Sequence, residues 1–317
     1  MILVTGATGF LGSELVRQLI SHHEPIRAIK RSTSLVPDIL KNQKKIYWMD
    51  ADVLDYFSLE EAFEHVEQVY HCAAMISKEP SDKKKMLQTN VQGTANVVNL
   101  CLQKNIKKLV HVSSIAALGD GKLNQFITEK DSWDLTGKRT NYAISKYESE
   151  MEVFRAIAEG LNAVIVNPSI ILGKNAETCG SGGLFKMVQK GQWYYPQGAC
   201  GFVAVEDVAQ SMIALMNSDF SAERYIVSAE NWFYRDLFAE IAHRLCVNPP
   251  RKKLRSWMAW ASLLLTKEMT PSMFKKRVYL NSKIQSAISF EFRPIKQVIA
   301  EICDQGFLSD SAIKLIS

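Results

Sequence analysis

The first dozen residues constrain the fold most strongly. The apolar run Met1 to Val4 leads directly into a segment with a glycine at every third position, Gly6, Gly9 and Gly12. From Leu11 to Ile20, apolar residues then recur at helical spacing. This order predicts a strand, a sharp turn and a helix, with a backbone that can approach a pyrophosphate closely and a helix N-terminus that can hold the phosphates. An ordinary glycine-rich turn between a strand and a helix is the alternative.

Composition narrows the class of protein. The 317 residues suffice for one large domain or for two that share the chain. A hydrophobic content of 47% and a charged content of 22% are typical of soluble globular proteins, and a net charge of +5 is too small to favour a nucleic-acid partner. The six cysteines occur singly and the six histidines do not cluster with them, so we expect reduced thiols and no metal site.

The sequence also carries indications of location. Because an apolar strand begins at Met1, no room is left for a cleavable signal, and we expect a cytoplasmic protein with no membrane span. The longest apolar stretch, Trp257 to Leu265, is too short to cross a bilayer. We interpret it as a buried helix or a wall of the substrate pocket. Its tryptophans and flanking basic residues would also suit a membrane surface, which is the alternative.

Further apolar runs predict a series of strands, several followed by helical patterns. The runs lie at 26–30, 45–49, 66–71, 109–112, 163–167 and 224–227. This succession predicts an α/β protein with a doubly wound parallel sheet. The pair Ser58 and Glu61 has capping-box spacing, which predicts a helix beginning at Ser58. Residues 120–140 show no clear period and are interpreted as a long loop, and Gly180 to Gly183 as a substrate loop or a surface turn.

Residues at the ends of the second, third and fourth strands bear on a dinucleotide. The second strand ends in Lys30 and Arg31, where an acid would accept from ribose hydroxyls but a cation tolerates a 2′-phosphate. We therefore favour NADP over NAD, although both cations could face solvent. Asp52, followed by Val53, would meet the adenine or serve only a turn. The small residues from Cys72 to Ala74 leave space for the dinucleotide.

Tyr142 and Lys146 lie four residues apart, on one face of a predicted helix. A phenol ordinarily has a pKa near ~10, and an ammonium group close by lowers it. Tyr142 would then be a usable general acid or base. The spacing alone arises by chance in many helices, but here it follows a strand that ends in Ser113 and Ser114.

Together these motifs resemble the extended (atypical) short-chain dehydrogenase/reductases of the NAD-dependent epimerase/dehydratase family. The resemblance covers essentially the whole chain and includes Asn90 to Thr94. The segment from Val166 to Gly173, with Asn167 and Pro168 where many sugar epimerases have Arg-Pro, is more similar to the dihydroflavonol and cinnamoyl-CoA reductase branch.

The resemblance implies a Rossmann fold and specific roles for individual residues. Tyr142 is the expected catalytic acid or base, Lys146 its activator, and Ser114 the hydroxyl that polarises the substrate. The residues expected to bind the cofactor are Gly6, Thr8, Gly9, Phe10, Leu11, Gly12, Lys30, Arg31, Asp52, Val53, Cys72, Ala73, Ala74, Ser113, Tyr142, Lys146, Asn167 and Pro168. Residues 1–168 and 202–228 are expected to form the dinucleotide-binding domain, and residues 169–201 and 229–317 a smaller substrate domain.

Three functions are compatible with this resemblance. The preferred one is an NADP-dependent oxidoreductase acting on a carbonyl or secondary alcohol of a small molecule. An NAD-dependent nucleotide-sugar epimerase is the alternative, and a catalytically silent NADP-binding protein is a third. Ile115 and Ala116 follow Ser114 where family dehydratases carry an acid pair, which disfavours dehydration. The resemblance also implies that the helical segments 90–101 and 142–158 could form the interface of a homodimer.

Overall fold

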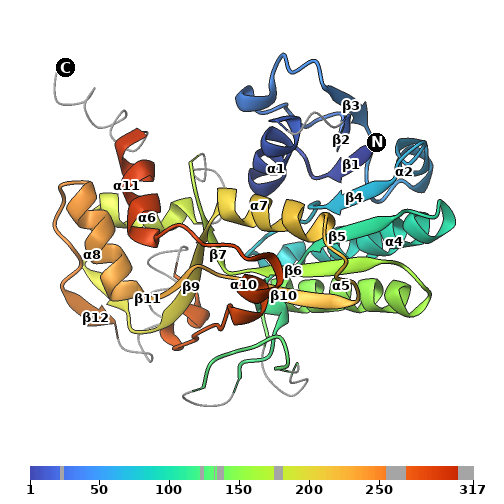
Figure 1. Cartoon of the computed structure of the whole chain (residues 1–317). Helices are drawn as coiled ribbons and strands as arrows, with labels where there is room; N and C mark the ends of the chain where they lie inside the picture. The colour runs from blue at the N-terminus through green and yellow to red at the C-terminus, as the bar shows by residue number, and fades with distance from the viewer. Residues whose placement is uncertain are drawn as a thin grey trace.

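The structure is a computed structural model that describes residues 1–21, 25–121, 125–131, 133, 139–174, 181–254 and 269–305. Its centre is a seven-stranded sheet in the order β10-β6-β5-β4-β1-β2-β3 with every neighbouring pair parallel (Figure 1). The strands are β1 (Ile2–Thr5), β2 (Ile26–Lys30), β3 (Ile46–Asp50), β4 (Gln68–His71), β5 (Lys108–Val112), β6 (Ala163–Pro168) and β10 (Glu223–Val227). The predicted doubly wound parallel sheet is confirmed. The order reverses between β1 and β4, which is where such sheets bind ligands.

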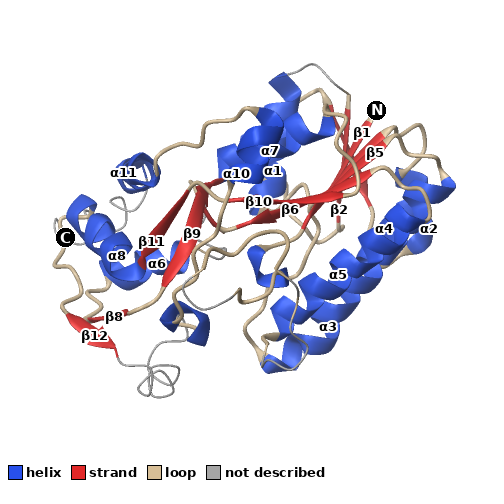
Figure 2. Ribbon diagram, turned by 60° about the horizontal axis from the view of Figure 1, so that its bottom comes forward, coloured by secondary structure: helices blue, strands red, loops and turns tan. Residues whose placement is uncertain are grey.

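Helices cover both faces of this sheet (Figure 2). One face carries α1 (Phe10–Ser21), α7 (Val205–Met216) and α10 (Ser282–Ile288). The other carries α2 (Tyr56–Ala62), α4 (Gly93–Gln103) and α5 (Asn141–Ala158). The helix expected over 90–101 is preceded by α3 (Lys83–Leu87) and by one π-helical stretch, Gln88–Gln92, which runs directly into α4. Strands covered in this way are buried on both faces, which explains the near-continuous apolar sequences of β1 and β6.

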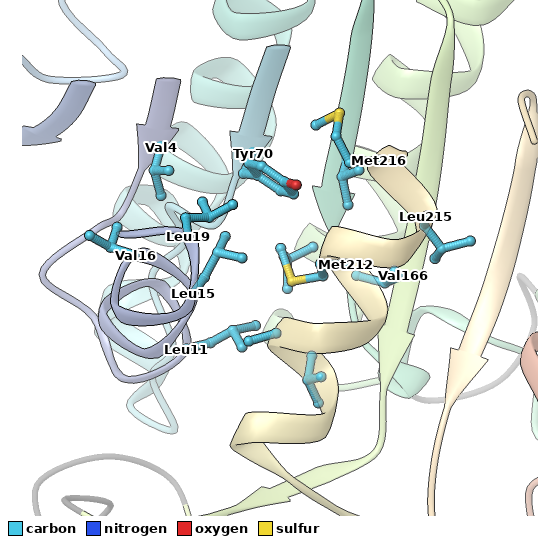
Figure 3. Packing of buried hydrophobic residues seen from close by; sticks show 14 of the residues in the cluster. Val4, Leu11, Leu15, Val16, Leu19, Tyr70, Val166, Met212, Leu215 and Met216 are labelled. Atoms are coloured by element: carbon cyan, nitrogen blue, oxygen red, sulfur yellow. The ribbon is translucent and has the colours of Figure 1, made fainter. Parts of the chain in front are cut away.

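The main core lies between the sheet, α1 and α7. Figure 3 shows Val4 and Tyr70 of the sheet close to Leu15 of α1 and Met212 of α7. These side chains are at most 1% exposed. Successive strand residues point to opposite faces, so Leu3, beside Val4, packs into the second cluster under α4 and α5. The two clusters therefore lie on opposite faces of the main sheet.

A second group of elements lies beyond the β6 and β10 edge of the sheet (Figure 1). It contains a three-stranded sheet in the order β11-β9-β7, and the pair β12-β8. The strands are β7 (Ile170–Leu172), β8 (Tyr194–Pro196), β9 (Ala199–Ala204), β11 (Glu230–Phe233) and β12 (Lys252–Leu254), and the helices are α6 (Gly182–Gln189), α8 (Tyr234–Arg244) and α11 (Ile295–Gln305). These elements share their own apolar cluster. The chain enters this group after β6, returns to the main sheet through α7 and β10, and leaves it again.

Two local predictions are wrong. Helix α2 begins at Tyr56 and not at Ser58, because the Asp55 carboxylate accepts a hydrogen bond from the Phe57 amide at 3.2 Å and caps the helix. Gly182 and Gly183 open helix α6 instead of extending a loop. The stretch Trp257 to Leu265 lies outside the described residues. Within the described ranges, no helix is both long enough and apolar enough to cross a bilayer.

Candidate active site

The glycine turn packs directly on neighbouring backbone. Gly6 has a φ of +66°, a conformation that favours glycine, and its carbonyl accepts from the Gly9 amide at 2.9 Å. A Cβ at Gly12 would lie 2.2 Å from the Gly6 carbonyl oxygen, and a Cβ at Gly6 would lie 2.6 Å from the Ala73 nitrogen. The turn, the start of α1 and the segment after β4 therefore meet without side chains between them, as a closely approaching pyrophosphate requires. Thr8, Phe10 and Leu11 lie in the same turn and first helical residues.

The buried His71 links the segments that meet at the glycine turn. The Thr94 hydroxyl donates to the Asn90 carbonyl at 2.6 Å, so it accepts from His71 Nε2 at 3.0 Å. His71 Nδ1 must then accept from the Thr5 hydroxyl at 2.7 Å, and Thr5 Oγ1 accepts from the Ala73 amide at 3.2 Å. This chain of bonds needs a neutral imidazole, and burial lowers the pKa of His71 to about 3. It ties the ends of β1 and β4 to helix α4.

The two cations after β2 differ in their surroundings. Lys30 Nζ forms an ion pair with Asp50 of β3 at 2.5 Å. Arg31 is exposed, and its side chain makes no hydrogen bond or ion pair with any of the described residues. Of these two cations, only Arg31 lacks a carboxylate partner in the described chain.

The next candidate pair lies after β3. One Asp52 carboxylate oxygen accepts from the Leu54 amide at 2.9 Å, so the side chain stabilises a turn as well as lying at the strand end. Val53 is buried, and its carbonyl accepts from the Asn96 side chain at 2.8 Å. A Cβ at Gly93 would lie 2.7 Å from a Val53 methyl group. Val53 is thus clamped by α4, while Asp52 stays half-buried.

The three residues expected to be catalytic lie together. Thr140 caps α5 by accepting from the Ala143 amide at 3.1 Å, which places Tyr142 in the first turn of the helix. Ser114 lies close enough to Tyr142 for its hydroxyl to lower the pKa of the phenol. One turn further along α5, Lys146 Nζ donates to the carbonyl of Val112 at 2.8 Å, at the end of β5.

The pKa of Tyr142 moves in the direction opposite to the one expected from the sequence. Burial raises it to about 12, and only the contact with Ser114 opposes this rise. The Lys146 ammonium, which was expected to lower this pKa, instead donates to the Val112 carbonyl. Burial also lowers the pKa of Lys146 to about 8, although Cys72 and the Glu150 carboxylate oppose this fall. Tyr142 is therefore protonated at neutral pH.

A buried polar network contacts the backbone of the site. Asn167, at the end of β6, donates its amide to the Ser114 carbonyl at 3.0 Å and to Glu150 at 2.5 Å. Glu150 is fully buried in α5 and forms an ion pair with Arg224 of β10 at 3.1 Å. The sequence analysis missed Glu150 and Arg224. Glu150 could have been found from its spacing, since it continues the four-residue step from Tyr142 through Lys146 along one helix face.

Several buried polar atoms near this network have no partner among the described residues. They are Ser113 Oγ, Asn167 Oδ1 and Ser169 Oγ, at or just beyond the carboxyl ends of β5 and β6. Buried polar groups normally pair, so unpaired ones mark places where a ligand can supply the bond. Pro168 closes β6 at the same place and is buried. Cys72 and Ala74 are half-buried at the end of β4.

Ser114 and Tyr142 line a cavity of about 710 Å³. Its apolar wall includes Ile76, Ile115, Leu118, Ile170 and Met269. Its polar wall includes Asp120, Arg139, Lys275 and Arg277. The cavity has the size of a small-molecule site. No group of His, Cys, Asp or Glu side chains in the described ranges could hold a metal ion.

Residues 2–228 match the model of the NAD dependent epimerase/dehydratase family. The chain belongs to this family. It is therefore an enzyme of a class that uses a nicotinamide cofactor. The match ends just after β10, so it includes the whole main sheet and leaves the last segment of the chain outside.

Individual relatives agree with this membership. Sterol demethylase protein B of Methylococcus capsulatus is 31% identical over 234 residues, which cover 72% of this chain and 70% of that protein. Cinnamoyl-CoA reductase 1 of Petunia hybrida is 26% identical over 320 residues, 95% of this chain and 90% of that protein. The crystal structure of gox2253 superposes with a TM-score of 0.86 and 28% identity, covering 96% of this chain and 97% of that one.

Proposed function

We propose that this protein is an NADP-dependent oxidoreductase that transfers a hydride between the nicotinamide and a carbonyl or secondary alcohol. The observation that carries the proposal is that Ser114 and Tyr142 line the same cavity, with Lys146 one helical turn from Tyr142. Two hydroxyls on the wall of one cavity could both bind a carbonyl oxygen there. The relative named cinnamoyl-CoA reductase supports reduction as the direction.

The residues present fit a dinucleotide. The turn from Gly6 to Gly12 and the N-terminus of α1 would hold the pyrophosphate. Arg31 would pair with a 2′-phosphate, while Lys30 remains bound to Asp50. The unpaired Ser113 and Asn167 atoms would serve the nicotinamide end.

Half-buried Asp52 and its neighbour Val53 would border the adenine. The small residues Cys72, Ala73 and Ala74 would leave room for the dinucleotide at the end of β4. At the opposite end of the cofactor, Pro168 would border the nicotinamide.

When bound, the cofactor supplies the hydride. The chain's own residues then handle the proton and the oxygen. Tyr142, protonated at neutral pH, donates its proton to the oxygen of the substrate, because an alkoxide is a stronger base than a phenolate. Ser114 donates a hydrogen bond to the same oxygen and stabilises the developing charge. The Lys146 ammonium would hold the nicotinamide ribose and stabilise the Tyr142 phenolate that remains.

Turnover assays test this proposal. Purified protein is mixed with NADPH and a panel of aldehydes, ketones and thioesters, and NADPH consumption is followed by absorbance. Tyr142→Phe should lower kcat by about a hundredfold or more, because a positioned general acid contributes ~10²–10⁴. Tyr147→Phe, on the same helix but stacked on Trp133, is the matched control.

The opposite outcome would identify the alternative function. An epimerase retains its dinucleotide through the reaction, whereas a reductase releases the oxidised form. Protein that is purified with NAD bound and interconverts sugar nucleotides without net NADPH consumption would refute the reductase proposal.

A further inference from the structure

The cavity contains more positive than negative charge in its described wall. The charged side chains are Lys78, Glu79, Asp120, Arg139, Lys275 and Arg277. Lys78 and Glu79 offset each other, so three cations remain against the single carboxylate of Asp120. This leaves an excess of two positive charges in a space of about 710 Å³.

All three cations contact the same carboxylate. Asp120 lies 3.0 Å from Arg139, 3.0 Å from Lys275 and 2.5 Å from Arg277. These cations hold the pKa of Asp120 at about 2, below its usual value, so it stays charged. One carboxylate can balance only one of them. Gathering like charges costs free energy unless a further anion balances them, and a bound ligand can supply that anion.

Arg139 supplies an independent indication. Its side chain is only 9% exposed, it lines the cavity, and its buried Nε has no hydrogen-bond partner in the described part of the chain. The guanidinium lies 4.8 Å from the centre of the Trp133 ring, which in turn stacks on Tyr147 of α5 at 4.5 Å. Arg139 is therefore held in place with an unused donor, which is the condition for preorganised anion binding.

We propose that Arg139, Lys275 and Arg277 form an oxyanion subsite, and that the substrate carries a phosphate or carboxylate group at the end of its molecule away from the reacting carbonyl. The apolar wall that includes Ile115, Leu118 and Ile170 would take the body of the substrate. This inference rests on the proposed function for the reacting end only. The subsite itself can be tested without turnover.

The test is a calorimetric titration of protein saturated with NADP⁺, so that the glycine turn is occupied. The probes are inorganic pyrophosphate and benzoate, at constant ionic strength. Wild-type protein should bind at least one of them, and the tighter probe tells phosphate from carboxylate. Arg277→Gln should weaken binding about tenfold or more, since it removes a charge-assisted bond.

Asp120→Asn provides the decisive variant. It should strengthen binding of the same probe, because the three cations lose their internal competitor, whereas simple damage to the cavity would weaken binding. Lys253→Gln, an exposed position on β12 outside the cavity wall, should leave binding unchanged. No binding of either probe, or equal affinity in all variants, would overturn the subsite. Absence of NADP⁺ binding in the first step would instead count against the proposed function, and the Arg277 and Asp120 variants would still report on the subsite.

Discussion

Lys30 and Asp50, at the facing ends of β2 and β3, form an ion pair of 2.5 Å. The strand pairing places them directly opposite each other, so the first cation after β2 already has a partner within the fold. We therefore propose that Arg31, one residue further on, determines which dinucleotide binds.

Arg31→Ala should weaken NADPH binding about tenfold at low ionic strength and leave NADH binding unchanged. A charge-assisted bond to an exposed phosphate is worth about 1.5 kcal/mol, and salt reduces it. Fluorescence titration with each cofactor measures both affinities. Lys30→Gln is the matched control and should change the ratio of the two affinities by less than about threefold. An unchanged ratio in Arg31→Ala would contradict the assignment.

The reductive kcat/KM should fall as the pH rises above about 8. Burial lowers the pKa of Lys146 to about 8, so the ammonium is present below that pH and is lost above it. The measurement is a pH profile of NADPH-dependent reduction with the best substrate of the panel. Lys146→Arg retains its charge throughout this range, so its profile should lack the decline even if its rate is lower. A similar decline in Lys146→Arg would show that the fall of kcat/KM above pH 8 comes from another group.

Glu150→Gln should lower the free energy of unfolding by about 3 kcal/mol, because it breaks a buried ion pair and leaves Arg224 without its carboxylate. Urea unfolding followed by fluorescence measures the change. Glu152→Gln, two residues along the same helix, removes a partly exposed pair with Arg155 and should cost less than about 0.5 kcal/mol. Equal effects at the two positions would show that the buried pair is not a support of the site.

Acid should destabilise the protein through His111. Its ring is buried with neither nitrogen hydrogen-bonded among the described residues, and burial holds its pKa well below the usual value. The unfolded chain therefore binds a proton below about pH 6.5 that the folded chain does not, so stability falls as the pH falls. His111→Leu should reduce this slope by about 1.4 kcal/mol per pH unit between pH 6 and 4.

Urea unfolding at several pH values measures the slope for His111→Leu. The exposed His243 of α8 is the matched control, and His243→Gln should leave the slope unchanged. A slope that is equally steep in His111→Leu and the wild type would contradict the prediction.

Local patterns were sufficient to predict most of the main sheet. The strand predicted over 163–167 agrees with β6, Ala163–Pro168, to within one residue, since a strand buried on both faces leaves a continuous apolar signal. The glycine turn and the pair Tyr142 and Lys146 were also readable, because each depends on spacing within one segment. The start of helix α2 was predicted two residues too late. Both Asp55 and Ser58 are residue types that cap helices, and Asp55 is the cap in the structure.

Long-range features could not be predicted from the sequence. The Glu150 and Arg224 pair joins residues 74 positions apart, and Arg277 reaches Asp120 across 157 positions. The direction of the Tyr142 pKa shift depends on how deeply the phenol is buried, which no spacing rule states. Spacing placed Lys146 on the correct face, but its bond to Val112 is a property of the folded site.

The pairing of β9 with β11 limits how this protein could be recombined with its relatives. The family match ends at residue 228, yet Phe202 before that point pairs with Glu230 after it, and the Phe202 ring lies edge-on to Tyr234 at 6.0 Å. A chimera joined at residue 228 would therefore set one protein's β9 beside another's β11. A working exchange of substrate preference would need to transplant the interleaved segments from both sides of β10 together.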